Sequence, residues 1–145
     1  PPLAYGRHHP DPREGHMGWN NLLLWELQWL FRIYYIALGI TQIVIPHGLP
    51  PMMEWMYELS DTLHVVVGIA EILGGVGLIL PSITRIQPQL SVYAAAGLVL
   101  VMAGAIVYHA GRGEGPSIVT NVIIAALMAF VAYGRWKIAP IQPRR

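Results

Sequence analysis

Five polar residues stand inside otherwise apolar stretches of the chain, where they could bind a ligand. They are Gln42, His64, Glu71, His109 and Asn121. Polar groups within a bilayer are costly, so they usually pair with one another or serve a function. Imidazole and amide groups can donate hydrogen bonds to carbonyl oxygens, such as those in the head of a quinone. The set indicates either a pocket for a quinone or a lipid headgroup, or a network of interhelical hydrogen bonds.

Two charged residues are predicted at membrane depth, Glu71 in one apolar stretch and Arg32 in another. A buried carboxylate must be paired or neutralised. We predict an intramembrane ion pair between Arg32 and Glu71, and a proton-carrying carboxylic acid at Glu71 is the alternative. The pair requires that the first apolar helix begin near Leu22, because a start near Leu30 would let the guanidinium extend to the interface.

The composition excludes several other kinds of chemistry. The chain has no cysteine, which removes thiolate metal sites, iron–sulfur clusters, disulfide relays and cysteine nucleophiles. His8 and His9 lack acidic partners at ligand spacing, so we predict no metal site. No basic stripe indicates a nucleic acid partner. We therefore expect no intrinsic cofactor and no catalysis by the isolated chain. The ligand that we expect it to bind is a quinone or a lipid.

Four apolar stretches must position these residues. Hydrophobic residues make up 54% of the 145 residues and charged residues only 12%, which is typical of a membrane protein. Each stretch is close to the roughly 20 helical residues that cross a bilayer. Proline and glycine separate the stretches, and Pro81 is expected to end the second. The predicted spans are Leu22–Ile45, Leu63–Leu80, Gln89–Ala110 and Ile118–Trp136.

The predicted fold is therefore an all-α, antiparallel bundle of four transmembrane helices over residues 22–136. A polar Pro/His-rich head, residues 1–21, precedes the bundle, and a tail, residues 137–145, follows it. The head has no apolar core, so it does not read as a signal peptide. Both segments are expected on the cytoplasmic side and in contact with other subunits.

The distribution of Lys and Arg predicts this orientation. If the head is inside, seven basic residues lie on the inner side, only Arg112 lies on the outer side, and Arg32 lies within a span. Such a bias places both termini in the cytoplasm. The inner residues are Arg7, Arg13, Arg85, Arg135, Lys137, Arg144 and Arg145.

The connection between the first two spans contains a further helical pattern. Apolar residues recur at helical spacing after Pro51, with acidic residues on the opposite face. The apolar set is Met52, Trp55, Met56 and Leu59, and the acidic set is Glu54, Glu58 and Asp61. The pattern predicts a short helix in the membrane interface, either as a simple connector or as a lid.

Glycines indicate where the helices approach one another. Small residues allow close backbone contact between membrane helices. We expect such packing at Gly68, Gly74, Gly75, Gly77, Gly97 and Gly104.

Several of these residues also form recognisable motifs. The run GIAEILGGVGLILP from Gly68 to Pro81 resembles the G-x-x-E-x-L-G signature of the DoxX-like family of small four-helix membrane proteins. Met102-Ala103-Gly104-Ala105 followed by His109 is similar to the family's M-x-G-A-x-x-x-H pattern. Similarities to its first and fourth helices are carried by Arg32, Gly39, Asn121 and the run from Ala132 to Arg135. One departure is Gln42, where the family usually has lysine.

The resemblance implies a multi-pass protein of a prokaryotic cytoplasmic membrane, where some relatives are small subunits of quinone-linked oxidoreductases. The first functional hypothesis is a non-catalytic accessory subunit of a larger respiratory or photosynthetic electron-transfer complex. The alternative is a quinone-binding small subunit that uses the outer polar layer. A transporter ranks last, because four short helices without an inverted repeat give little material for alternating access.

Overall fold

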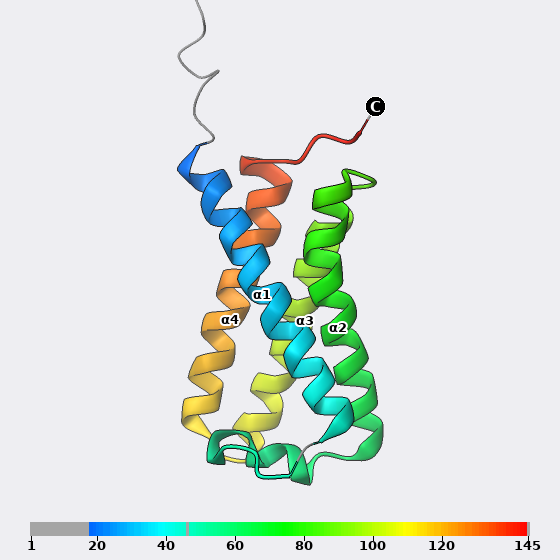
Figure 1. The fold of residues 1–145 in the computed structure, drawn as a ribbon. Coiled ribbons are helices and arrows are strands. Elements are labelled where there is room, and N and C mark those ends of the chain that lie inside the picture. The colour runs from blue at the N-terminus through cyan, green and yellow to red at the C-terminus, as the bar shows by residue number, and fades with distance from the viewer. Residues whose placement is uncertain (1–17, 46, 145) are drawn as a thin grey trace, which may run out of the picture.

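The chain folds into four long antiparallel helices, which a computed structural model describes over residues 18–45 and 47–144 (Figure 1). The helices are α1 (Trp19–Val44), α2 (Asp61–Thr84), α3 (Leu90–Gly111) and α4 (Gly115–Tyr133). Within the described ranges, four helices are long and apolar enough to cross a membrane, the last extending to Ile138. The predicted all-α bundle is confirmed, and each observed helix lies within a few residues of its predicted span.

The two ends of the bundle differ in what covers them. A 3-10 helix, η1 (Pro51–Glu58), lies across the end where α1 stops and α2 begins, and we call this the η1 end (Figure 1). The opposite end, where α1 begins and the C-terminal segment leaves α4, is the tail end. The short helix predicted after Pro51 is present as η1. Its position in the membrane interface and the cytoplasmic location of the termini stay predictions. Only part of its apolar set packs on the bundle, since Met56 is buried whereas Met52 is exposed.

Helix α1 changes its neighbour along its length. At the tail end, the Leu24 side chain packs against Gly134 in η2 (Gly134–Ile138), a π-helical turn that continues α4. At the η1 end, Gly39 packs against Gly68 of α2 instead. In Figure 1, α1 accordingly runs diagonally, and it diverges from α4 toward the η1 end.

The α1–α2 contact depends on glycine. A Cβ atom on Gly39 would lie 2.5 Å from the backbone oxygen of Gly68, and a Cβ atom on Gly68 would lie 2.8 Å from the oxygen of Gly39. Gly75 packs in the same way, since a Cβ atom on this residue would lie 3.1 Å from the backbone oxygen of Arg32. The packing predicted for Gly97 and Gly104 is wrong, because no atom of the described residues lies within 4 Å of the position of a Cβ atom there.

Pro81 does not end the second span. Helix α2 continues through this residue to Thr84, although proline cannot donate to the oxygen four residues earlier. Side chains supply hydrogen bonds nearby: Gln28 Nε2 donates to the oxygen of Leu78, and the Thr84 hydroxyl donates to that of Leu80. These bonds go to oxygens close to Pro81 and not to the oxygen of Gly77, which is the one that loses its usual donor. Membrane helices tolerate proline because neighbouring helices, side chains and local adjustments can satisfy the freed group.

A buried polar cluster fixes α1 at the tail end. Arg135 Nε donates to Gln28 Oε1 at 2.6 Å, and Arg135 also donates through a terminal nitrogen to Asn21 Oδ1 at 2.6 Å. Gln28 Nε2 donates to Ser82 Oγ at 3.1 Å. The guanidinium carbon of Arg135 lies 4.8 Å from the Trp25 ring centroid. These contacts tie α1 to both α2 and η2.

The glycine contact gives a stability prediction. Gly39→Ala should lower the free energy of unfolding by about 1–3 kcal/mol, because the new methyl group meets backbone rather than a movable side chain. The matched control is Gly97→Ala, where the space is open and alanine is the better helix former. Thermal unfolding in detergent measures both variants. Equal stability of the two would contradict the close α1–α2 contact.

Candidate ligand-binding site

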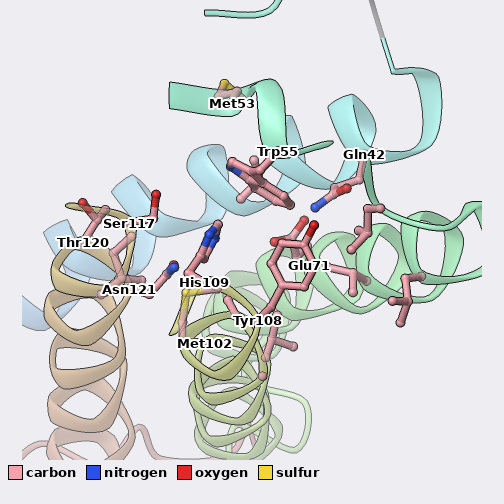
Figure 2. A pocket seen from close by; sticks show the side chains of 18 of the residues that line it. Gln42, Met53, Trp55, Glu71, Met102, Tyr108, His109, Ser117, Thr120 and Asn121 are labelled. Atoms are coloured by element: carbon pink, nitrogen blue, oxygen red, sulfur yellow. The ribbon is translucent and has the colours of Figure 1, made fainter. Parts of the chain in front are cut away.

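A cavity of about 580 Å³ lies at the η1 end, bounded by all four long helices and by η1 (Figure 2). Its walls are mainly apolar, with residues such as Leu38, Val67 and Ala70. Four of the five residues predicted to form a polar layer line it, namely Gln42, Glu71, His109 and Asn121. The structure therefore brings these side chains from four different helices to one space.

His64, the fifth predicted residue, is buried and supports Gln42 instead of lining the cavity. Its Nδ1 lies 2.8 Å from Gln42 Oε1. The amide oxygen can only accept, so Nδ1 of His64 donates and thereby sets the orientation of the amide. Figure 2 shows the amide nitrogen of Gln42 pointing toward Glu71. His64 thus positions a donor in the cavity.

Two buried polar atoms that face this part of the cavity have no hydrogen-bond partner among the described residues. They are Glu71 Oε2 and the hydroxyl oxygen of Tyr108, and Figure 2 shows both side chains at this part of the cavity. Leaving a buried polar group unsatisfied costs about 1–3 kcal/mol. A ligand that supplies hydrogen-bonding atoms to Glu71 and Tyr108 would remove this cost.

The predicted ion pair between Arg32 and Glu71 is wrong: no such pair is present among the described residues. The guanidinium of Arg32 lies over the Trp29 ring, 4.8 Å from its centroid. The backbone of Arg32 is level with Gly75, one turn nearer the tail end than Glu71. Because helical side chains point toward their own N-terminus, the Arg32 side chain extends away from Glu71.

A chain of charged contacts connects the cavity wall to η1, and we call His109, Glu114, Arg112 and Glu58 the clasp. His109 Nδ1 lies 2.6 Å from Glu114 Oε2, and Arg112 Nε donates to Glu114 Oε1 at 2.6 Å. A terminal nitrogen of Arg112 donates to Glu58 Oε2 at 2.5 Å. Glu58 is the last residue of η1, so the clasp ties this helix to the α3–α4 connection.

Trp55 adds an aromatic contact between η1 and the cavity wall. Its ring lies edge-on to His109, with centroids 5.0 Å apart, and 6.0 Å from the ring of Tyr108. Figure 2 shows the indole between η1 and these two side chains. Together, the clasp and Trp55 hold η1 over the cavity as a lid.

The charges of the clasp reinforce one another. Hydrogen bonds from Arg112 lower the pKa of the Glu58 carboxyl, and those from Arg112 and then His109 lower the pKa of the Glu114 carboxyl. The two carboxylates in turn raise the pKa of Arg112. Both acids are therefore ionised at neutral pH. Glu114 accepts from Nδ1 of His109, so in the neutral imidazole Nε2 is the acceptor.

Sequence reasoning missed two members of this site. The helical pattern places Trp55 on the apolar face of a short interfacial helix, either a connector or a lid, and its spacing alone does not distinguish lipid from a cavity. Glu114 lies in a short connection rich in glycine, and only the fold brings it back to His109. The sequence signal for this contact is a glutamate five residues after a histidine that stands at a helix end.

Comparison with protein families identifies the class of this chain. A family model described as the DoxX-like family matches residues 27–131, so the chain belongs to that family, as its motifs predicted. The matched segment contains every residue that lines the cavity. Searches of curated proteins and of solved structures found no match.

The clasp gives a pH prediction for the lid. Because the pKa values of Glu58 and Glu114 are lowered in the folded chain, their stabilisation is complete above the ordinary carboxyl pKa of 4.5 and is lost as the pH falls through the lowered values. A fluorine probe on Met53→Cys, in a chain without other cysteines, should therefore show one closed lid signal from neutral pH down to about 4.5. An open signal should grow only below that pH. A transition at pH 6 to 7 would contradict the carboxylate account.

A substitution tests the same clasp at constant pH. Arg112→Gln should increase the open fraction of the probe roughly two- to fivefold at neutral pH, the scale expected for solvent-exposed ion pairs. Arg85→Gln removes one positive charge at the tail end and serves as the control. Equal effects of the two substitutions would show that net charge, and not the clasp, sets the position of the lid.

Proposed function

We propose that this chain binds a quinone in the cavity at the η1 end and acts as a small quinone-binding subunit of a quinone-linked oxidoreductase in the membrane. The observation that carries the proposal is a pair of polar atoms, Glu71 Oε2 and the Tyr108 hydroxyl, which are buried beside a largely apolar cavity and have no hydrogen-bond partner in the described part of the chain. Small-molecule sites typically combine apolar walls with a few convergent polar groups.

The size of the cavity supports a ligand of this class. Its volume of about 580 Å³ lies within the roughly 300–1,000 Å³ of typical small-molecule sites. Methionine and aliphatic residues such as Met102 and Ile124 would surround an apolar ring or tail. The polar residues would then meet the oxygens of the head.

The hydrogen-bonding groups suit both forms of a quinone. The Tyr108 hydroxyl and the Gln42 amide would donate to carbonyl oxygens of the oxidised form. The reduced form carries two hydroxyl groups, which would donate to an oxygen of the Glu71 carboxyl group and to Nε2 of a neutral His109. Electron transfer to or from the quinone would require a redox partner in another subunit, which is why the proposal places the chain in a larger complex.

The path of α1 supports entry of the ligand from the bilayer. Its contacts with the last helical segment include Leu24 against Gly134 and Gln28 with Arg135, both at the tail end. At the η1 end, Tyr34 and Leu38 of α1 line the cavity on one side and Asn121 of α4 lines it on another. A lipid-soluble molecule would enter between these helices, while η1 covers the end of the bundle.

The C-terminal segment bears on the accessory-subunit hypothesis. Its predicted contact was with another protein, but Arg144 N donates to the oxygen of Arg85 within the same chain at 2.9 Å. Residues 1–17 of the predicted cytoplasmic head lie outside the described residues. A partner at either segment stays a prediction, so we propose the quinone-binding role ahead of the accessory role.

Binding of a short-chain quinone, decylubiquinone, tests the proposal. Quenching of tryptophan fluorescence in nanodiscs would report the affinity, since Trp55 lines the cavity. Ala105→Phe should fill part of the cavity and weaken binding roughly tenfold or more. The control is Ala103→Phe on the same helix, at an exposed position outside the cavity.

A second pair of variants isolates the polar contact. Tyr108→Phe removes only the unpaired hydroxyl and should weaken binding roughly 5- to 100-fold, the loss expected for one hydrogen bond in a buried site. Tyr133→Phe, at an exposed position on α4, should leave the affinity unchanged. Absence of quinone binding to the wild-type chain would overturn the proposal and favour the accessory role.

A further inference from the structure

A second cavity, of about 530 Å³, lies at the tail end, far from the proposed quinone site. It is enclosed by the connection between α2 and α3, the first turn of α3, η2 and the C-terminal segment. Its lining includes Gln87, Gln89, Ser91, Arg135, Trp136 and Gln142. Several of these side chains carry hydrogen-bonding groups, in contrast to the mainly apolar walls at the η1 end.

The charge around this cavity is positive and uncompensated. Arg135 is only 3% exposed, and none of the ion pairs among the described residues includes it. One of its terminal nitrogens, Nη2, is buried without a hydrogen-bond partner within residues 18–45 and 47–144. A buried guanidinium stays charged and is stabilised by a nearby anion. Its hydrogen bonds to Gln28 and Asn21 are to neutral groups, so they leave the charge unbalanced.

The rim of the cavity is held in place by hydrogen bonds. Arg85 Nε donates to the backbone oxygen of Gln142 at 3.0 Å, and Arg144 N donates to the backbone oxygen of Arg85. Figure 1 shows the C-terminal segment crossing from α4 toward the end of α2. The Arg85 guanidinium is therefore held beside Gln142, a residue of the cavity lining.

Aromatic residues indicate the depth of this cavity in the membrane. Trp136 and Tyr93 both line it, and they are 62% and 67% exposed. Tryptophan and tyrosine are enriched at the level of the lipid headgroups. Basic pockets between transmembrane helices at this level bind the headgroups of acidic lipids.

We infer that the tail-end cavity binds the phosphate headgroup of an anionic phospholipid, with the amides of the lining as hydrogen-bond donors and the arginines as counter-charges. The inference is independent of the quinone proposal, because the two cavities lie at opposite ends of the bundle. It also accounts for the buried positive charge of Arg135, for which the described residues supply no acid.

Lipid titration of the full chain in a neutral detergent tests the inference. Phosphatidylglycerol should raise the melting temperature with a saturable dose dependence, whereas phosphatidylcholine should not. Inorganic phosphate should also have no effect, because it lacks the acyl chains that hold a lipid at this depth. Equal stabilisation by phosphatidylcholine would overturn the anionic selectivity, and equal stabilisation by phosphate would overturn the assignment to a lipid.

Substitutions at the same end distinguish a built site from general attraction. Arg85→Gln should weaken the affinity for phosphatidylglycerol about fivefold, and Arg85→Lys should restore most of it. Lys137→Gln removes the same charge from an exposed residue outside the cavity lining and should have little effect. Equal losses for Arg85→Gln and Lys137→Gln would show diffuse surface attraction and overturn the site. Arg135→Gln should abolish the lipid effect, and the Arg85 variants decide the question if that variant does not fold.

Discussion

The arrangement of the bundle depends on one constraint, which is that α1 is held by different helices at its two ends. At the η1 end, the backbones of Gly39 and Gly68 meet so closely that neither position can accept a Cβ atom. At the tail end, Gln28 and Arg135 join α1 to η2. A straight helix fixed at these two points must cross the bundle diagonally and diverge from α4 toward the η1 end. The cavity occupies the space that this crossing leaves, and η1 covers it.

Some buried polar residues join the helices, whereas others keep an unsatisfied atom beside a cavity. At the tail end, Gln28 and Ser82 are buried and hydrogen-bonded within the bundle. Such contacts fix helices together, as polar groups commonly do in membranes. At the η1 end, Glu71 and Tyr108 each keep a buried oxygen without a partner among the described residues. Unsatisfied groups beside a cavity destabilise the empty bundle, which is why we assign them to a ligand.

The lid couples the cavity to charges outside the membrane-spanning helices. His109 belongs to the cavity wall, yet its orientation is set by Glu114, which also binds the guanidinium that holds Glu58. A ligand that changes the position of His109 would therefore affect the contact between η1 and the α3–α4 connection. Binding in the cavity and closure of the lid are linked through shared hydrogen bonds, so each should change the free energy of the other by the same amount.

Much of the fold could be predicted from the sequence, because hydropathy and helix length are local properties. The polar layer could also be placed, since the depth of Gln42, His109 and Asn121 follows from their distance to the helix ends. The direction of the Arg32 side chain relative to Glu71 could not be predicted, because it depends on how far α1 is displaced along α2. That displacement is set by the Gly39–Gly68 contact, which no single helix reveals.

Contacts between segments that are distant in the sequence could not be predicted either. The helical pattern predicted η1, but its spacing did not show that Trp55 covers His109. Proline normally ends a helix, and the continuation of α2 through Pro81 depends on its tertiary surroundings, where Gln28 contributes a hydrogen bond beside it from another helix. The Gln28 side chain also accepts a hydrogen bond from Arg135, so one residue of α1 contacts both α2 and η2.

Photolabelling with an azidoquinone in nanodiscs tests the central claim most directly. The account predicts that mass spectrometry will find the label on cavity residues such as Tyr108, His109 and Asn121, and that excess decylubiquinone will suppress it. The Ala105→Phe variant should lose this labelling while the Ala103→Phe variant keeps it. Labelling confined to exposed residues such as Val107 and Val119, unaffected by competing quinone, would contradict a quinone site within the bundle.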